Sequence, residues 1–151
     1  MKFVMTDKLR DEAQIRSILD DAAKALYAKD AEALVAHYAA DVSVANLAPP
    51  LRHEGPEACN RAAIKHWFDT WSGPINLELR DVRIEISGDI AFAHGLSHMS
   101  GIKRDGERPD LWLRITHCFR KEGGEWKTAH IHESVPFYMD GNFRAATDLK
   151  P

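Results

Sequence analysis

The sequence predicts an α+β protein in which helices pack on one face of a curved, antiparallel β-sheet. Two observations support this prediction. Apolar residues recur at three- and four-residue spacing in the first half of the chain, which is typical of amphipathic helices. They alternate with a period of two in the second half, which is typical of half-buried strands. The resulting order is helix, helix, strand, helix and then four strands.

Three segments carry helical signals. Residues 8–28 place apolar side chains such as Ile15 and Leu19 on one stripe. Asp30 is a suitable N-cap for a short second helix over 31–39, because its carboxylate can accept a hydrogen bond from an unpaired amide of the first turn. Gly55-Pro56 opens a third helix over 56–71, since proline at the first helical position lacks only an amide hydrogen that would be unpaired anyway.

Strand signals occur in five segments, which are residues 42–46, 77–86, 90–100, 111–120 and 126–135. The apolar alternation reverses at Arg80-Asp81, which predicts a bulge or a bend. Gly123-Gly124 predicts a hairpin turn between the last two strands. Residues 138–151 show no period and are expected to form a C-terminal tail.

Composition narrows the class of protein. A length of 151 residues predicts one domain, over residues 1–151. The chain has 20 Lys and Arg residues and 23 Asp and Glu residues, which gives a net charge of −3. This balance disfavours nucleic acid as a partner, because binding phosphates needs a concentrated basic surface. No apolar run is long enough to span a membrane, and residues 1–7 lack the apolar segment of a secretory signal. We therefore expect a cytoplasmic protein without a membrane partner, whose Cys59 and Cys118 are reduced thiols.

Four segments then resemble a known superfamily. They are residues 30–38, the Leu-Ala-Pro-Pro-Leu stretch 47–51, residues 82–101, and residues 118–137 with their Trp-Lys-x-x-His-x-His-x-Ser-x-Pro-Phe ending. Together they resemble the NTF2-like superfamily over about residues 10–137, and most closely its SnoaL-like and ketosteroid-isomerase-like bacterial members. The resemblance implies a cone in which three N-terminal helices and a curved antiparallel sheet enclose a pocket. It also implies a homodimer.

The resemblance does not imply one activity. The superfamily includes isomerases, dehydratases, cyclases and non-catalytic binding modules, and a shared fold is weak evidence for function. Ala22, Asn46 and Ile115 stand where its steroid isomerases carry a tyrosine donor, an aspartate base and a second acidic donor. The chain therefore lacks that set of proton-transfer groups.

The register of the last hairpin decides which polar side chains share a face. A loop of two or four residues would set His117 opposite His130, whereas a loop of three or five would set Ile115 beside Ile131 or Glu133. The odd loop separates apolar from polar residues more cleanly, so we favour it. On that register the helix-covered face carries the isolated polar residues Asn46, His94, His117 and Glu133.

A mostly apolar pocket with a few polar groups is the usual small-molecule site. We predict His94 and Glu133 as a catalytic pair in which the carboxylate orients the imidazole for proton transfer. The alternative is that both are structural, with Glu133 held by Arg114 or a lysine. The predicted ligand-binding residues are Asn46, Trp67, Phe92, Leu113, Ile115, His117 and Ile131.

The expected ligand is a small, largely apolar organic molecule. The expected reaction is an isomerisation, dehydration or cyclisation by His/Glu proton transfer without a cofactor. The alternative function is a non-catalytic ligand-binding or dimerisation module.

Arg114, His130 and His132 form a secondary polar cluster, predicted to lie on the opposite face at a dimer interface or its edge. His130 and His132 point to the same side of a strand and could share a cation. A third ligand, His117, would join them only in the disfavoured register. We therefore expect no metal, and expect both histidines to bond across a dimer interface or to Ser134 and Thr116.

Overall fold

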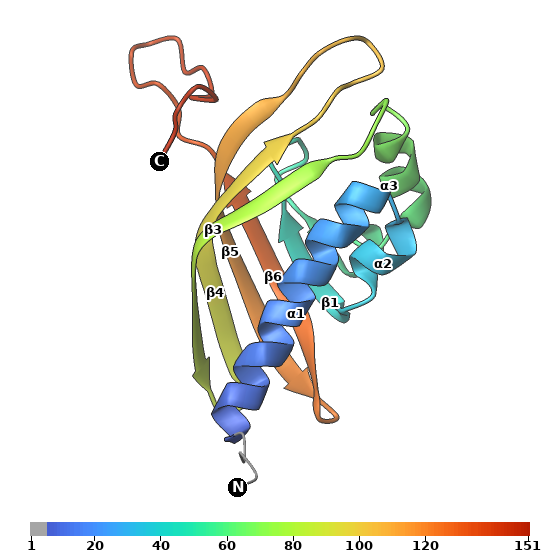
Figure 1. The fold of residues 1–151 in the computed structure, drawn as a ribbon, viewed down its shortest axis with the longest axis vertical. Helices are drawn as coiled ribbons and strands as arrows, with labels where there is room; N and C mark the ends of the chain where they lie inside the picture. The colour runs from blue at the N-terminus through green and yellow to red at the C-terminus, as the bar shows by residue number, and fades with distance from the viewer. Residues whose placement is uncertain (1–5) are drawn as a thin grey trace, which may run out of the picture.

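One long helix lies across the inner side of a curved sheet (Figure 1). The structure is a computed structural model that describes residues 6–151. Part of the N-terminal segment that bears on a secretory signal, Met1–Met5, lies outside the described residues. None of the helices within 6–151 combines the length and the apolar character that crossing a membrane requires.

The helices begin at polar caps. Helix α1 (Asp7–Ala28) starts after Thr6, whose hydroxyl accepts a hydrogen bond from the Leu9 amide, and ends at Lys29 in a left-handed conformation. Helix α2 (Ala31–Val35) is capped by Asp30, as predicted. It ends well before residue 39, because the chain enters the sheet at Tyr38.

The predicted third helix is interrupted. Gly55–Glu57 form a single 3-10 turn, η1, and helix α3 covers only Arg61–Phe68. The Asn60 side chain accepts a hydrogen bond from the Ala63 amide, so Asn60 caps a new helix rather than continuing an old one.

The sheet has six strands in the order β2-β1-β6-β5-β4-β3. Their bounds are β1 Tyr38–Ala45, β2 His53–Glu54, β3 Asn76–Ser87, β4 Ile90–Ser100, β5 Asp110–Glu122 and β6 Glu125–Ser134. The pairs from β3 to β6 are antiparallel, but β1 runs parallel to β6. The sheet is therefore mixed rather than wholly antiparallel, because the last strand of the chain returns beside the first in the same direction.

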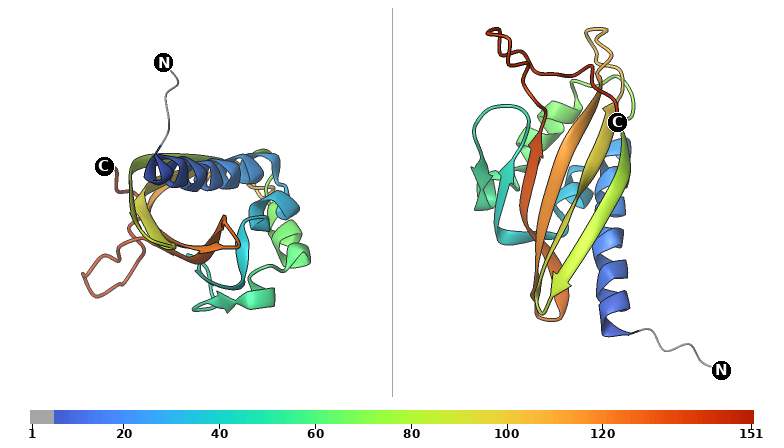
Figure 2. Two further views of the ribbon diagram at one scale, coloured as in Figure 1. Left: turned by 90° about the horizontal axis from the view of Figure 1, so that it is seen from below. Right: turned by 90° about the vertical axis from the view of Figure 1, so that its left-hand side faces the viewer.

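The predicted irregularity in β3 is confirmed. The register shifts between Arg80 and Arg83, so that two residues of β3 oppose Gly95 alone, and Asp81 has a positive φ of 56°. Such a bulge bends a strand, which is consistent with the curvature of the sheet in Figure 2.

A second bulge in β6 sets the register of the last hairpin. Gly123-Gly124 forms a two-residue turn, yet Phe119 pairs with Thr128 while Cys118 pairs with His130, which leaves Ala129 unpaired. Beyond the bulge Ile115 lies opposite Glu133. The favoured register is thus confirmed, but it arises from an even turn plus a bulge rather than from an odd loop.

Helix α1 packs on the face of the sheet that we call the inner face, and the opposite face is the outer face (Figure 2). The helix contacts β5 and β6 through Asp11, which accepts hydrogen bonds from Lys121 Nζ of β5 and Trp126 Nε1 of β6, both at 2.9 Å. The Trp126 and Lys121 donors hold the pKa of the Asp11 carboxyl below its usual value. The largest buried cluster beneath α1 consists of Ile15, Ile18, Leu19, Ala91, Ala93, Phe119 and Trp126.

The backbone of β3 at its bulge lies close to Gly95 of β4, and a substitution of Gly95 tests this close approach. A Cβ atom at Gly95 would lie 2.9 Å from the Arg80 carbonyl oxygen and 3.1 Å from Val82 Cα, both of which are backbone atoms. We expect Gly95→Ala to lower the free energy of unfolding by about 1–3 kcal/mol, as for overpacking elsewhere. Urea unfolding measures this change. Gly73→Ala is the control, because no atom lies within 4 Å of its Cβ position, and equal stability of the two variants would contradict the tight approach.

Candidate functional site

Five of the predicted site residues share the inner face. Leu113, Ile115 and Ile131 are buried, whereas His117 and Glu133 are half-buried. The pairing of Ile115 with Glu133 and of His117 with Ile131 places them side by side on β5 and β6. The inner face therefore places a carboxyl group and an imidazole at diagonal positions of two neighbouring strands, among apolar side chains.

The predicted placement of His94 is wrong. His94 pairs with Thr116, which pairs with His132, so His94 lies on the outer face and is exposed. Glu133 lies on the inner face, in the row that continues through Ile115 to Gly95. The structure therefore does not bring His94 and Glu133 together.

Phe92 was also predicted to face the pocket. It stands two residues before His94 on β4, so it lies on the outer face as well, with 43% of its surface exposed. The larger residues of β4 were expected to face the helices. Instead Ala91 and Ala93 face α1, because small side chains let the helix approach the sheet closely.

Two other predicted ligand-binding residues, Asn46 and Trp67, do not lie on β5 or β6. Asn46 is exposed in the loop after β1. Trp67 belongs to α3, where its ring packs at 5.4 Å from the Phe68 ring and at 5.8 Å from the Trp71 ring. A helical aromatic stripe of this kind explains the position of Trp67 without a ligand.

Glu133 is a carboxyl group without a cationic partner. It forms no ion pair or hydrogen bond with any residue in the described range 6–151. Burial raises the pKa of Glu133 to about 6, because the surrounding protein disfavours the charged form. At neutral pH the side chain is thus mostly ionised, and it binds a proton more readily than an exposed glutamate.

Two neutral groups accompany it. Burial, reinforced by the charge of Glu133, raises the pKa of the Tyr38 phenol, so Tyr38 remains a hydrogen-bond donor at all physiological pH values. Burial lowers the pKa of His117 to about 4, with a smaller effect from His130. The His117 imidazole is therefore uncharged at neutral pH.

Tyr38 and Cys59 are the site residues that the sequence analysis missed. Both pack against the buried side chains of Val42, Val44 and Ile131. Tyr38 was assigned to a helix, although its even spacing from Val42 and Val44 could have marked it as part of the strand. Cys59 is a free, half-buried thiol in the segment before α3.

The secondary polar cluster lies on the outer face, as predicted. Arg114 Nε donates a hydrogen bond to Ser134 Oγ at 3.1 Å. The rings of His130 and His132 lie with their centroids 6.3 Å apart. Thr116 lies opposite His132, but neither histidine forms a hydrogen bond with Thr116 or Ser134, so the expectation of bonds to these two residues is wrong.

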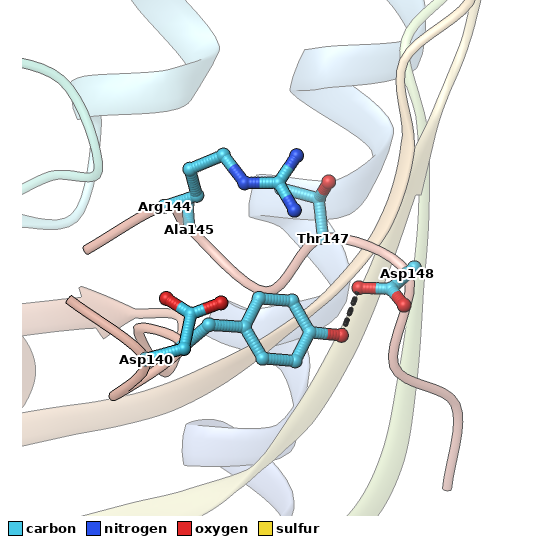
Figure 3. Close-up of a pocket in the computed structure, with 6 residues that line it drawn as sticks. Asp140, Arg144, Ala145, Thr147 and Asp148 are labelled. Atoms are coloured by element: carbon cyan, nitrogen blue, oxygen red, sulfur yellow. Dashed lines mark hydrogen bonds between the residues drawn. The ribbon is translucent and has the colours of Figure 1, made fainter. Parts of the chain in front are cut away.

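Two cavities occur elsewhere among the described residues. One, of about 500 Å³, is formed by the C-terminal tail, where the Tyr138 hydroxyl donates to Asp148 Oδ1 (Figure 3). The other, of about 300 Å³, lies between α1 and α2. There His37 Nε2 lies 3.0 Å from Asp21 Oδ2. No predicted site residue lines either cavity.

The fold is the NTF2-like α+β cone. Residues 15–138 match the model of the SnoaL-like domain, and the chain belongs to this SnoaL-like family. No curated protein sequence matches the chain.

Solved structures support the same fold. An NTF2-like protein of unknown function from Pseudomonas putida KT2440 is 27% identical over 94% of this chain and 97% of its own, with a TM-score of 0.82. The hexachlorocyclohexane dehydrochlorinase LinA-type3 from Novosphingobium barchaimii LL02 is 15% identical over 96% and 98%, with a TM-score of 0.75. An NTF2-like protein from Novosphingobium aromaticivorans is 20% identical over 95% and 92%, with a TM-score of 0.67.

The opposite pKa shifts of Glu133 and His117 predict opposite effects of pH on stability. The folded protein binds the Glu133 proton more tightly than the unfolded chain, so a cost of about 2 kcal/mol develops as the pH rises from 4.5 through 6. It binds the His117 proton less tightly, so a cost of about 3 kcal/mol develops as the pH falls from 6.5 through 4.

We therefore expect Glu133→Gln to remove the loss of stability that develops as the pH rises through 6. We expect His117→Gln to remove the loss that develops as the pH falls through 4. Urea unfolding across this pH range measures both effects as changes in slope. Asn46→Ala is the control and should keep the wild-type profile, because Asn46 is exposed and has no ionisable group. If all three variants follow the wild-type profile, the two groups are not desolvated.

Proposed function

We propose that the chain is an enzyme that transfers protons on a small, largely apolar carbonyl compound bound at the inner face. Glu133 is the base, and Tyr38 holds the carbonyl oxygen. The observation that carries this proposal is a half-buried carboxyl group among apolar side chains, without a cation to neutralise it, whose pKa is raised to about 6. Carboxyl groups tuned in this way are suited to proton transfer near neutral pH.

The reaction follows from the two groups. The Glu133 carboxylate removes a proton from the carbon next to the carbonyl group; the C–H electron pair forms a new C=C bond, and the π pair of the carbonyl group moves onto its oxygen. The Tyr38 hydroxyl donates a hydrogen bond to the resulting enolate, which stabilises the developing negative charge. If the substrate has a C=C bond one carbon further on, Glu133 returns the proton to the far end of that bond while the C=O bond re-forms, which gives isomerisation. If that carbon carries a leaving group instead, the group departs with its bonding pair as the C=O bond re-forms and Glu133 releases its proton to water, which gives elimination.

The charge of the site supports a neutral substrate. Tyr38 and His117 are uncharged at neutral pH, and Glu133 supplies a single negative charge. An anionic substrate would meet this charge without a compensating cation. The dehydrochlorinase among the structural neighbours performs an elimination, as its name states, which is one of the two outcomes above.

Hydrogen–deuterium exchange tests the proton-transfer step before the natural substrate is known. A panel of simple ketones is incubated in D₂O with the protein, and deuterium next to the carbonyl group is measured by NMR. We expect Glu133→Gln to slow the exchange by about 10²–10⁴-fold, the usual contribution of a general base. Tyr38→Phe should slow it by about 10²-fold or more.

The wild-type exchange rate should rise with pH around a midpoint near 6, because the base must be ionised. His94→Ala serves as the matched control, since it removes an exposed imidazole on the opposite face. Exchange that persists in Glu133→Gln would exclude the proposed base. Ligand binding without exchange would favour the alternative of a non-catalytic binding module.

We also propose that the outer face pairs two copies of the chain. Phe92 and Ile90 are 43% and 57% exposed there, and exposed apolar side chains on a broad sheet face favour association. The same face carries both signs of charge, so that a second copy can oppose carboxylates to guanidinium groups. These groups are Glu78, Glu85, Asp110, Arg80, Arg83 and Arg114.

Sedimentation velocity tests the dimer. We expect the wild-type protein to sediment as a dimer and Phe92→Glu to shift it toward the monomer, because the new carboxylate would be buried without a partner. Leu51→Glu is the control, since Leu51 is 97% exposed in a loop. A monomeric wild-type protein, or a dimer that Phe92→Glu leaves intact, would contradict this interface.

A further inference from the structure

We propose that two copies of the chain bind one zinc-like divalent ion between them, through His130 and His132 of each copy. This inference rests on the outer-face dimer proposed above and is independent of the chemistry proposed for Glu133. The site is incomplete in a single chain, and the second copy supplies half of its ligands.

The two histidines have the geometry of a chelating pair. They stand two residues apart on β6, on the same face, with ring centroids 6.3 Å apart and planes tilted by 56°. Zinc–nitrogen bonds of about 2.0–2.1 Å place the centroids of two tetrahedral imidazole ligands about 5 Å apart. The rings must therefore approach by about 1 Å, which side-chain rotation allows, because His132 is exposed and His130 is half-buried.

Their surroundings leave space for an ion. On the neighbouring strands Ser43 and Cys118 flank His130, and Ala45 and Thr116 flank His132. All four side chains are small. None of them carries a positive charge, and the nearby guanidinium group of Arg114 donates a hydrogen bond to Ser134 Oγ at 3.1 Å.

Their nitrogen atoms are available. Other histidines already bond to carboxylates, His37 to Asp21 at 3.0 Å and His98 to Asp110 at 2.6 Å. His130 and His132 form no hydrogen bond or ion pair with any residue in the range 6–151. An imidazole nitrogen without a competing partner is a good ligand for zinc.

A single copy cannot complete the site. Among the described residues, no three histidine, cysteine, aspartate or glutamate side chains are arranged to hold a metal ion. A structural zinc site needs four ligands in a tetrahedron. A two-fold axis duplicates every ligand, so two histidines from each copy make four.

The position of β6 favours this axis. In the order β2-β1-β6-β5-β4-β3, β6 is one of the two middle strands, so its outer-face residues lie near the centre of the sheet. When two copies pack through the same face, the symmetry axis passes through the centre of their contact. The shared site requires this axis to pass beside β6, so that the histidine pairs of the two copies meet across it and Phe92 and Ile90 of β4 lie to one side of the axis.

Zinc titration of chelator-treated protein tests the inference. Calorimetry and native mass spectrometry should show one zinc ion for two chains. Sedimentation should show the dimer strengthened by zinc. We expect His130→Gln and His132→Gln each to abolish this stoichiometry, with circular dichroism confirming that the variants fold.

Two control variants define the ligand set. His94→Gln removes an exposed outer-face histidine, and Cys118→Ser removes the thiol opposite His130. Both should bind zinc as the wild type does. Binding lost in either control would contradict the four-histidine site.

Other outcomes separate this inference from the proposals on which it rests. One zinc ion for each chain, binding that survives both histidine substitutions, or a dimer that binds no zinc would overturn the shared site, and the last would leave the dimer standing. A protein that remains monomeric with zinc would overturn the site and the dimer together. None of these results changes the exchange assay for Glu133.

Discussion

A single unpaired residue in β6, Ala129, determines which chemistry lies on each face of the sheet. Before the bulge, Trp126 and Thr128 point inward and are buried. After it the alternation is reversed, so that Ile131 and Glu133 point inward while the intervening histidines point outward. Without the bulge, the hairpin turn would place Glu133 on the outer face. The proposed base and the proposed metal pair therefore both depend on one backbone irregularity.

The two faces of the sheet differ in the charged groups that they carry. The inner face surrounds Glu133 with apolar side chains and neutral polar groups, and the cost of its ionisation remains uncompensated. Such a cost is typical of functional groups, because a partner that stabilised the charge would also reduce the reactivity of the carboxylate. The outer face mixes arginines and carboxylates at an exposed surface, which suits association with another copy of the chain.

The sequence predicted the face of the sheet correctly for the site residues of β5 but not for those of β4. On β5 the alternation of Leu113, Ile115 and His117 was regular, and their shared inner face was predicted correctly. On β4 the rule that larger apolar residues face the core failed, because α1 packs closely against alanines and leaves Phe92 outside. His94 was misplaced along with Phe92, since both have the same parity on one strand.

The sequence by itself determined the family, the α+β class, most strand positions and the bulge near Arg80, because these depend on local periodicity, turn residues and motif spacing. Only the tertiary structure decided the parallel pairing of β1 with β6, the second bulge, and the packing of Tyr38 and Cys59 against Val42, Val44 and Ile131. Those features depend on contacts between segments far apart in the chain. A bulge also costs little locally, and its benefit appears only when the whole inner face packs against the helix and β1.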